Sequence, residues 1–339
     1  MYRGLAGMFL LDDPEARASG LPKDYGVDDF PLIVQDKVIN ADGTLSEERL
    51  DEGRFFLGDT ALVNGTRNPT LEVGTTRVRL RLLNASNARL FHIGFADGRT
   101  FHVVGGDVGL LPAPVPVTRV SLSPAERAEV VVAFSPGESV VLRGFGGVDE
   151  IDRGDFDLLT LTAARELAPS PALPDRLPST PPIEVPADAR VRRFALDGTD
   201  EINGLDFAMD RVDEVVPAGA REIWEVTASH YAHNFHIHEV AFRVLDIDGR
   251  QPPAWYQSHK DTVYLPAKST ARLAVEFGRF TDPTSPYMYH CHILRHEDKG
   301  MMGQFVIVEP GTESTVPRTL PTAAAHAHAA SASASASDG

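Results

Sequence analysis

Short runs of alternating polar and apolar residues recur along this chain and place the strongest constraint on its fold. Residues 77–83 read Arg-Val-Arg-Leu-Arg-Leu-Leu, the pattern of a strand with one buried face. Similar runs, most of them bounded by Gly, Pro, Asp or Ser, occur at 129–134, 140–144, 158–162, 222–227, 240–245, 272–277 and 304–309. Short strands at this spacing predict an all-β fold of sandwiches rather than alternating strands and helices. Met8–Leu11 is expected to be one further strand and Ser46–Glu52 a short helix.

A proline-rich stretch divides the chain. Seven prolines fall between Pro169 and Pro186, enough to force an extended segment with few ladder hydrogen bonds. With 339 residues the chain has room for two domains of ordinary size. We therefore predict one domain over residues 13–168, a linker over 169–186 and a second domain over 187–312. Residues 313–339 end in an Ala/Ser/His-rich run and are expected to be a disordered tail.

Charge and hydropathy exclude two kinds of partner. The net charge is −16 and no basic run is present, so a nucleic-acid partner is not expected. No apolar run approaches the roughly 20 residues of a membrane-spanning helix, so no membrane partner is expected. The N-terminus, MYRGLAGMFLLDD, has too short an apolar stretch for a signal peptide and lacks a small-residue cleavage site.

The chain contains a single cysteine, Cys291, with His290 and His292 on either side. A lone cysteine can form neither a disulfide within the chain nor the CxxC pairs of structural zinc sites. It is left as a buried inert thiol, a nucleophile or a metal-binding thiolate. The flanking histidines favour the thiolate, because imidazole and thiolate ligands together select soft and borderline metal ions.

Two segments hold six of the 12 histidines together with the cysteine. They read His233-Asn-Phe-His236-Ile-His238 and His290-Cys291-His292-Ile-Leu-Arg-His296-Glu297-Asp-Lys-Gly-Met301. Side chains of a strand alternate between its faces, so His236 and His238 should point one way and His233 the other. In the same way His290 and His292 should share a face while Cys291 takes the opposite one. Each segment therefore divides its ligands between two sites.

The first predicted site collects His233, Cys291, His296 and Met301. Two imidazoles, a thiolate and a weak axial thioether are the ligand set of blue-copper electron-transfer sites. The second site collects imidazoles only, from His236, His238, His290 and His292, and suits copper that binds dioxygen. Peptide bonds join Cys291 to two of these histidines, a path on the order of 10 Å for an electron. Structural zinc is the competing interpretation, but tetrahedral zinc requires neither two ligand sets of opposite parity nor the distant methionine.

A faint internal repeat links the two halves. Val63-Asn64-Gly65 precedes the run at 77–83, and Ile202-Asn203-Gly204 precedes the run at 222–227. Further along, Phe91-His92-Ile93-Gly94 matches Phe235-His236-Ile237-His238. The two domains are therefore interpreted as copies of one sandwich, of which only the second carries metal. His92 is expected to be structural, and neither His102 nor His230 is assigned a ligand role.

Residues 233–238 and 290–301 resemble the two C-terminal copper motifs of multicopper oxidases, the family of laccases, bilirubin oxidases and bacterial cuprous oxidases. The resemblance extends over residues 4–310. Beside the copper motifs, which are highly specific, it includes the moderately specific Gly4-Leu-Ala-Gly7, Leu62-Val-Asn-Gly65, Arg79–Ser86, Asn87-Ala-Arg89, Ile202-Asn-Gly204 and Lys260-Asp-Thr-Val263.

The resemblance implies a copper enzyme of three cupredoxin domains, each a Greek-key β-sandwich. This chain would hold the second and third in tandem, and residues 1–12 match the last strand of the first. His233, Cys291, His296 and Met301 match the type 1 copper ligands, His236 a type 2 ligand, and His238, His290 and His292 type 3 ligands. The catalytic residues would be Cys291, which carries electrons, and Glu297, which matches an acidic residue that relays protons. An ordinary exposed carboxylate is an equally good interpretation of Glu297. The family is extracytoplasmic, periplasmic or secreted.

One feature departs from the family pattern. The oxygen-reducing cluster of the family also takes histidines from HxH motifs in the first domain, and no such motif precedes residue 236 here. Three interpretations stay open. The chain is a truncated gene product, a second chain supplies the missing histidines, or the protein binds type 1 copper without reducing dioxygen.

The leading hypothesis is a multicopper oxidase, which takes single electrons from a small-molecule reductant and reduces dioxygen to water. Only six methionines occur and no Met-rich insert is visible, which favours phenolic or bilirubin-type donors over cuprous ions. The alternative is a non-enzymatic copper-binding or electron-transfer protein. Trp255, Tyr256 and His259 are expected to be ordinary loop residues rather than neighbours of the type 1 site.

Overall fold

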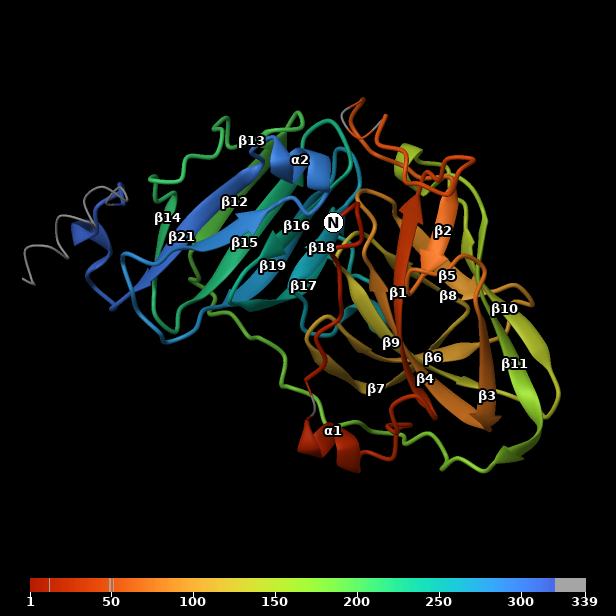
Figure 1. Cartoon of the computed structure of the whole chain (residues 1–339). Coiled ribbons are helices and arrows are strands. Elements are labelled where there is room, and N and C mark those ends of the chain that lie inside the picture. Colours follow the sequence, from red (N-terminus) through yellow and green to blue (C-terminus); the bar gives the residue numbers. More distant parts are fainter. Residues whose placement is uncertain (12, 49, 51, 321–339) are drawn as a thin grey trace, which may run out of the picture.

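The strands of the described residues form four sheets, which Figure 1 shows as two groups lying side by side. The computed structural model describes residues 1–320 apart from residues 12, 49 and 51. The first two sheets take their strands from residues 29–168 and the other two from residues 191–308. Each pair of sheets is a β-sandwich, so the predicted all-β fold of two Greek-key sandwiches in tandem is confirmed. The predicted limits of the domains and linker stay a prediction, and residues 321–339 of the expected tail lie outside the described residues.

The first sandwich contains a six-stranded sheet of order β2-β1-β4-β9-β6-β7 and a five-stranded sheet of order β3-β11-β10-β5-β8. Its strands are β1 (Asp29–Lys37), β2 (Thr60–Val63), β3 (Thr70–Thr75), β4 (Arg77–Asn84), β5 (Phe91–Phe95), β6 (Phe101–Gly106), β7 (Gly109–Val117), β8 (Arg119–Leu122), β9 (Arg127–Ala133), β10 (Ser139–Phe145) and β11 (Phe156–Ala168).

The second sandwich repeats this plan with sheet orders β13-β12-β15-β19-β17 and β14-β21-β20-β16-β18. All eight alternating runs singled out in the sequence overlap strands, which confirms those predictions. The strands here are β12 (Val191–Asp197), β13 (Glu201–Ile202), β14 (Glu214–Pro217), β15 (Arg221–Ala228), β16 (His233–Ile237), β17 (Ala241–Ile247), β18 (Thr262–Leu265), β19 (Thr270–Glu276), β20 (Tyr287–His290) and β21 (Met302–Val308).

The repeat noticed in the sequence recurs as matched hydrogen bonds. Asn64-Gly65 and Asn203-Gly204 follow β2 and β13, and all four residues have positive φ, which asparagine and glycine tolerate best. The Asn64 side chain accepts a hydrogen bond from the backbone N–H of Ile33 in β1 at 2.8 Å. The Asn203 side chain does the same for Ala195 in β12 at 2.7 Å. The two sandwiches therefore share the same Asn-Gly turn, which is hydrogen-bonded to the first strand of each sandwich.

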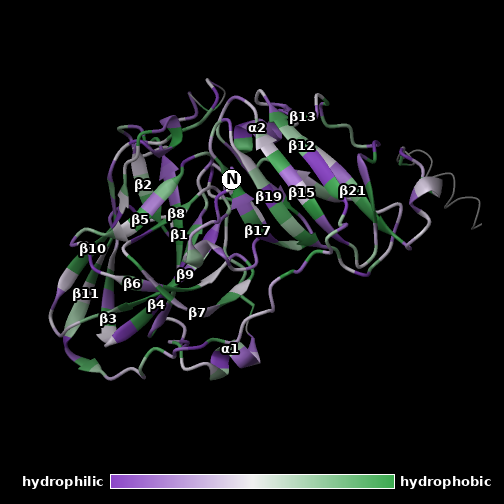
Figure 2. Cartoon of the chain, turned by 180° about the vertical axis from the view of Figure 1, so that it is seen from behind, coloured by the Kyte–Doolittle hydropathy of each residue, from purple (hydrophilic) through white to green (hydrophobic). Residues whose placement is uncertain are grey.

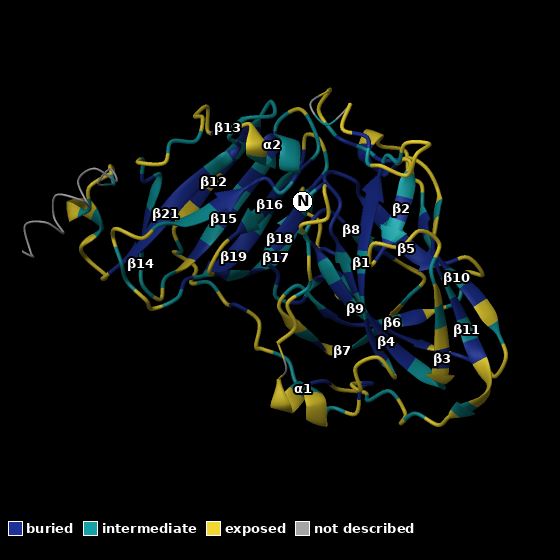
Figure 3. Cartoon of the chain, viewed as in Figure 1, coloured by how far each residue is buried: buried dark blue, intermediate teal, exposed yellow. Residues whose placement is uncertain are grey.

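Each sandwich has its own apolar core. Inward residues alternate with outward ones, as in β15, and Figures 2 and 3 show that apolar and buried residues concentrate in the strands. In the second core the Trp224 and Phe194 ring centroids lie 4.5 Å apart, and both side chains are buried. The cores also meet across the boundary, since Ala88 of the first half belongs to the second core and Trp255 packs against both. The two sandwiches therefore share a packed interface.

Two predicted elements were wrong. Met8–Leu11 forms no strand; no strand within the described residues pairs with it, and Phe9 and Leu11 stay exposed. The described residues of Ser46–Glu52 lie outside any helix and include a turn and a bend. Helices occur elsewhere, as α1 (Pro14–Ala18), α2 (Leu294–Asp298) and the 3-10 turns η1 (Glu150–Asp152), η2 (Ala254–Tyr256) and η3 (Glu313–Thr315). Helix α1 begins where Asp13 caps it and Pro14 occupies its first turn. Among the described residues, no helix has the length and apolar character needed to cross a membrane.

Candidate metal centre

Strand pairing brings the two histidine segments together. Strand β16 carries the first segment, and β20 with the following turn into α2 carries the second. The two strands are antiparallel neighbours, with His236 directly opposite His290. Residues that are more than 50 positions apart in the chain thus become cross-strand partners.

One group of donor atoms lies on the buried side of this pair. The Nδ1 atoms of His233 and His296 are 3.1 Å apart, and the Cys291 Sγ lies 3.6 and 3.5 Å from them. Metal bonds of about 2.0 Å to nitrogen and about 2.3 Å to sulfur, at trigonal angles, would separate such donors by about 3.5–3.8 Å. The three residues therefore fit a single metal ion with two imidazole ligands and one thiolate.

Burial prepares the two histidines of this group as ligands. Desolvation lowers the pKa of His233 to about 4, and desolvation together with the nearby His233 imidazole lowers the pKa of His296 to about 3. Both rings are therefore neutral near pH 7, with a lone pair to offer. Burial also raises the pKa of the Cys291 thiol to about 12, so a bound cation is needed to hold the thiolate.

Met301 is the fourth ligand that the sequence predicts for this group. Its side chain is fully buried in the same core as Cys291. The Cys291 N–H donates to the Met301 carbonyl at 3.1 Å, which ties the methionine to the cysteine through the backbone. A thioether is a weak, long axial ligand in trigonal copper sites. The position of Met301 is compatible with that role.

The second group contains imidazoles only. One ring nitrogen from each of His236, His238 and His290 lies within 4.8 Å of the others, and the His292 ring centroid is 5.4 Å from that of His290. The Nε2 atoms of His238 and His290 face each other at 3.3 Å. Two neutral imidazoles cannot both direct lone pairs at one point without a proton or a metal ion between them.

Hydrogen bonds decide which nitrogen of these rings is free. The Nδ1 of His236 lies 2.9 Å from the Asp261 carbonyl, and the Nδ1 of His290 lies 3.1 Å from the Cys291 carbonyl. A carbonyl only accepts, so both rings carry their proton on Nδ1 and present the Nε2 lone pair. The cysteine-containing group converges instead through Nδ1. The two groups thus lie on opposite faces and use opposite ring nitrogens.

Glu297 in α2 lies beside the second group. Its carboxylate is 3.4 Å from the Nδ1 of His290, and its side chain is about a quarter exposed. Burial alone would raise the pKa of Glu297, but the hydrogen bond from His290 and the attraction of the neighbouring imidazoles outweigh burial and hold that pKa below the usual range. Glu297 is therefore an ionised acceptor placed between a cluster histidine and the surface.

In the first sandwich, other residues occupy the positions that correspond to the predicted copper ligands of the second. Its His92 corresponds to His236, and both pair with a hydroxyl residue across the neighbouring strand, Ser121 and Thr262 respectively. The Nε2 of His92 donates to the Asp152 carboxylate at 3.0 Å, so its Nδ1 accepts from Ser121 at 2.7 Å. Both nitrogens of His92 are satisfied, as expected for a structural histidine.

Two glycines of the first sandwich occupy the positions of the cysteine and the histidine that follow β20 in the second. Strand pairing aligns Phe145 with His92 as it aligns His290 with His236, so Gly146 and Gly147 stand where Cys291 and His292 do. A Cβ on Gly147 would lie 2.0 Å from the Asp152 carboxylate. The carboxylate therefore fills the space that a histidine at position 147 would need.

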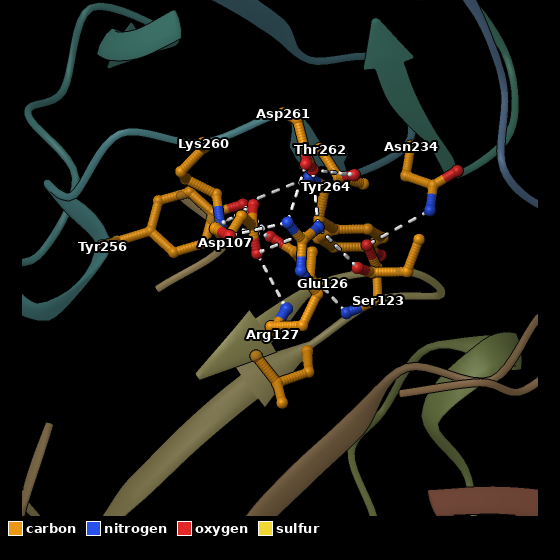
Figure 4. Close-up of polar contacts among 12 residues, drawn as sticks. Asp107, Ser123, Glu126, Arg127, Asn234, Tyr256, Lys260, Asp261, Thr262 and Tyr264 are labelled. Carbon is orange, nitrogen blue, oxygen red and sulfur yellow. Dashed lines mark hydrogen bonds and ion pairs between the residues drawn. The ribbon is translucent and has the colours of Figure 1, made fainter. Parts of the chain in front are cut away.

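A network of ionised side chains supports the metal centre from the first sandwich. Figure 4 shows Asp107, Glu126 and Arg127 meeting Lys260 and Asp261 across the interface. Arg127 donates to both oxygens of Asp261, at 2.6 and 2.7 Å. Lys260 is 2.8 Å from Asp107 and 3.2 Å from Glu126, and all three side chains are nearly fully buried. Asp261 also holds the His236 ring, so the network ends at a cluster histidine.

Asn234 links the interface to the cysteine. Its buried amide donates to the Pro124 carbonyl of the first sandwich at 2.8 Å and accepts from the His292 N–H at 2.7 Å. The Cys291 thiol lies 3.6 Å from the same amide oxygen. Sequence reasoning missed Asn234 and Arg127. Asp261 lies in a motif that the resemblance included, but nothing in the sequence signals its partner in the first sandwich.

The loop residues Trp255, Tyr256 and His259 pack at the interface. The Tyr256 hydroxyl is hydrogen-bonded to the buried Glu126, Trp255 contacts both cores, and His259 contacts the Pro181 carbonyl at 3.0 Å. Of the histidines given no ligand role, His230 is exposed and His102 is half-buried on β6. Burial and the nearby Arg77 lower the pKa of His102.

Comparisons with known proteins agree with this geometry. Residues 176–311 match the family model described as multicopper oxidase. The laccase-like multicopper oxidase CueO of Ochrobactrum sp. is 36% identical, with a TM-score of 0.78 over 88% of this chain and 70% of that one. A variant of the McoA multicopper oxidase of Aquifex aeolicus is 31% identical, with a TM-score of 0.83 over 91% of this chain and 72% of that one.

Curated relatives carry a different name. Cell division protein FtsP of Sodalis glossinidius is 40% identical over 319 residues, which cover 91% of this chain and 67% of the relative. The protein of the same name from Escherichia coli is 37% identical over 318 residues, again 91% and 67%. The chain thus spans about two thirds of the length of these relatives. The matched family model, the solved oxidases and the sandwich fold lead to one assignment: this chain belongs to the multicopper oxidase family.

Proposed function

We propose that this chain is the copper-binding part of an oxidase that takes single electrons from organic donors and reduces dioxygen to water. The observation that carries the proposal is the convergence of His233 Nδ1, His296 Nδ1 and Cys291 Sγ within 3.1–3.6 Å, beside a separate group of imidazoles. With Met301, the first group would hold type 1 copper. His236, His238, His290 and His292 would hold part of a type 2/type 3 cluster.

The protein would hold the copper ligands in place and keep water away from them. Copper in the two groups would accept one electron at a time and deliver four of them to dioxygen. His233, Cys291, His296 and Met301 exclude water, because each side chain is fully buried. Cys291 is covalently continuous with His290 and His292, so it provides the path between the groups. Glu297 would pass protons to the cluster, since its carboxylate is in reach of His290 and about a quarter exposed.

The partners follow from the site and the family. Phenolic or bilirubin-type molecules would be the reductants, and dioxygen the final acceptor. His238 is exposed and His236 half-exposed, so the imidazole group is open on one side to further ligands. We propose that a second polypeptide segment, from this gene or another chain, brings the remaining histidines to that side. An extracytoplasmic location is proposed from the family.

Copper loading tests this function. The chain is titrated anaerobically with copper, then copper per chain, the blue absorption band and oxygen uptake with a phenolic donor are measured. We expect an intense blue band, copper beyond the first equivalent, and oxygen uptake. A blue band with one copper and no uptake would support an electron-transfer protein instead. No blue band at any ratio would refute the type 1 assignment.

A second candidate function comes from the curated relatives, which are named cell division proteins. We propose as the alternative that this chain serves cell division without oxygen chemistry. The Cys291→Ser variant separates the two functions, because it removes the thiolate but keeps the buried volume. Normal division with that variant would support the alternative, and a division defect that tracks copper loss would contradict it.

A further inference from the structure

The cysteine-containing group is sealed from solvent. His233, Cys291, His296 and Met301 all have 0% exposure. The Nε2 atoms of both histidines are also buried, without a hydrogen-bond partner among the described residues. A donor in solution therefore touches no ligand of the proposed type 1 copper.

The first sandwich provides the cover over His296. The Phe55 ring centroid lies 5.4 Å from that of His296, and Phe55 and Leu57 pack against the second core. Exposure increases outward in steps, from the buried His296 to the half-buried Phe55 and the exposed Arg54. Phe55 thus separates the imidazole from solvent. This segment belongs to the connection between β1 and β2, so it comes from the sandwich that has no metal ligands.

The side chains on the outer side of this cover make exposed contacts. The Arg54 guanidinium lies 4.5 Å over the Tyr231 ring and is 2.9 Å from the Glu150 carboxylate, where both charged side chains are more than 40% exposed. Arg295 of α2 donates to the Leu50 carbonyl at 3.0 Å. Exposed ion pairs and cation–π contacts stabilise little, so the Arg54 side chain adds little to the hold on this segment. The next residue, Phe56, is buried and packs edge-on against Tyr2, so the backbone that carries Phe55 is anchored.

We propose that Phe55 is the specificity-determining residue at the electron entry of the type 1 site, an inference that rests on the proposed function. Each transfer removes one electron from the donor and reduces copper(II) to copper(I), and a phenol also releases its hydroxyl proton to solvent. With Phe55 in place, a donor delivers its electron across the phenyl ring and forms no hydrogen bond with His296 Nε2. Bulky phenols that need this hydrogen bond therefore react more slowly than donors that react through van der Waals contact.

Chemical modification of the metal-free protein tests the cover directly. Carbethoxylation of each histidine by diethylpyrocarbonate is followed by mass spectrometry in the wild type, Phe55→Ala, Arg54→Ala and Phe280→Ala. We expect the rate at His296 to rise by about tenfold or more in Phe55→Ala and by a smaller factor in Arg54→Ala. The exposed His230 is the reference. Phe280 is 67% exposed, in the loop next to Ile307 at the far end of β21 from Met301, so Phe280→Ala should match the wild type.

A copper-loaded measurement extends the test to electron entry. The blue band is bleached anaerobically by a bulky phenol and by ferrocyanide, and the two rates are compared. Phe55→Ala should accelerate the phenol by about tenfold or more relative to ferrocyanide. Equal modification of His296 in all variants, or an unchanged rate ratio, would overturn the proposal. If no variant or wild type turns blue, the proposed function fails, while the modification rates still decide the cover. Arg54→Ala removes an exposed side chain, so it keeps the test valid if Phe55→Ala does not fold.

Discussion

Arg127 in the first sandwich donates two hydrogen bonds to the Asp261 carboxylate in the second, at 2.6 and 2.7 Å. Asp261 in turn accepts through its backbone carbonyl from the Nδ1 of His236. One ion pair thus connects the sandwich without metal ligands to a cluster histidine. A carbonyl that accepts from the non-ligating nitrogen of a ligating imidazole fixes the orientation and tautomer of that ring.

Removal of either partner should destabilise the interface. The side chains of Arg127 and Asp261 are 28% and 18% exposed, so the pair is only partly screened by water. Asp261→Ala or Arg127→Met should each lower the free energy of unfolding by about 1–3 kcal/mol, because the remaining charge loses its partner. Urea unfolding of both variants and the double variant measures the coupling. The exposed Arg143–Asp157 pair is the control, and Arg143→Met should cost less than about 0.5 kcal/mol. Additive losses at Arg127 and Asp261 would contradict the pairing.

Lys260 should matter in a pH-dependent way. Burial disfavours its charge, but Asp107 and Glu126 outweigh burial and raise the pKa of Lys260. A raised pKa stabilises the folded state below the ordinary lysine pKa, and this stabilisation is lost as pH rises through the folded value. Lys260→Met should cost about 3–5 kcal/mol near pH 7, since two buried carboxylates lose their counter-ion. Burial raises the pKa of Glu126, so the cost should shrink as the pH falls and that carboxyl becomes protonated.

The measurement is urea unfolding of wild type and Lys260→Met over the acidic range and up to pH values above the pKa of Lys260. A gap between the two proteins that stays constant as the pH falls would show that the carboxylates are not the cause. A wild type that keeps its full stability above the pKa of Lys260 would contradict the ion pairing.

Asn234 should affect both stability and colour. Asn234→Ala leaves the Pro124 carbonyl and the His292 N–H without their buried partner, at a cost of about 2–3 kcal/mol. Because the same amide oxygen lies near the Cys291 sulfur, the blue band of the copper-loaded variant should shift in energy. Thermal unfolding and absorption spectra measure the two effects. Asn40→Ala, at an exposed site, is the control, and an unshifted band would place Asn234 outside the influence of the thiolate.

The thiolate itself should be irreplaceable for colour. Cys291→Ser replaces the thiol with a hydroxyl of similar volume that can still form hydrogen bonds. The fold should therefore persist while the intense blue band disappears. Absorption after copper addition checks this expectation, with His230→Ala as the control that should stay blue. A blue Cys291→Ser protein would overturn the ligand assignment.

Local patterns predicted the strands, because alternation of burial is a property of each strand and its sheet. The parity of His233, His236 and Cys291 likewise follows from strand geometry alone, and the structure places these residues in two groups. The prediction of a strand at Met8–Leu11 was wrong for the complementary reason. An apolar segment becomes a strand only where a partner strand accepts its hydrogen bonds, and that depends on the rest of the fold.

Long-range contacts account for what the sequence could not show. Arg127 and Asp261 are 134 positions apart, and Phe55 lies on a different sandwich from His296. No periodicity or motif relates such residues, since each local sequence is satisfied without the other. The replacement of ligands by Gly146 and Gly147 becomes visible only once strand pairing aligns the two copies.

The aligned positions of the two sandwiches also differ in how their buried polar groups are hydrogen-bonded. In the first sandwich the Asp152–His92–Ser121 hydrogen bonds fill the ligand space with satisfied polar groups. The second sandwich keeps the Nε2 atoms of His233 and His296 buried without partners among the described residues, a state that opposes folding. The first sandwich is therefore complete without a metal ion, whereas a metal ion bound by the second should raise its stability.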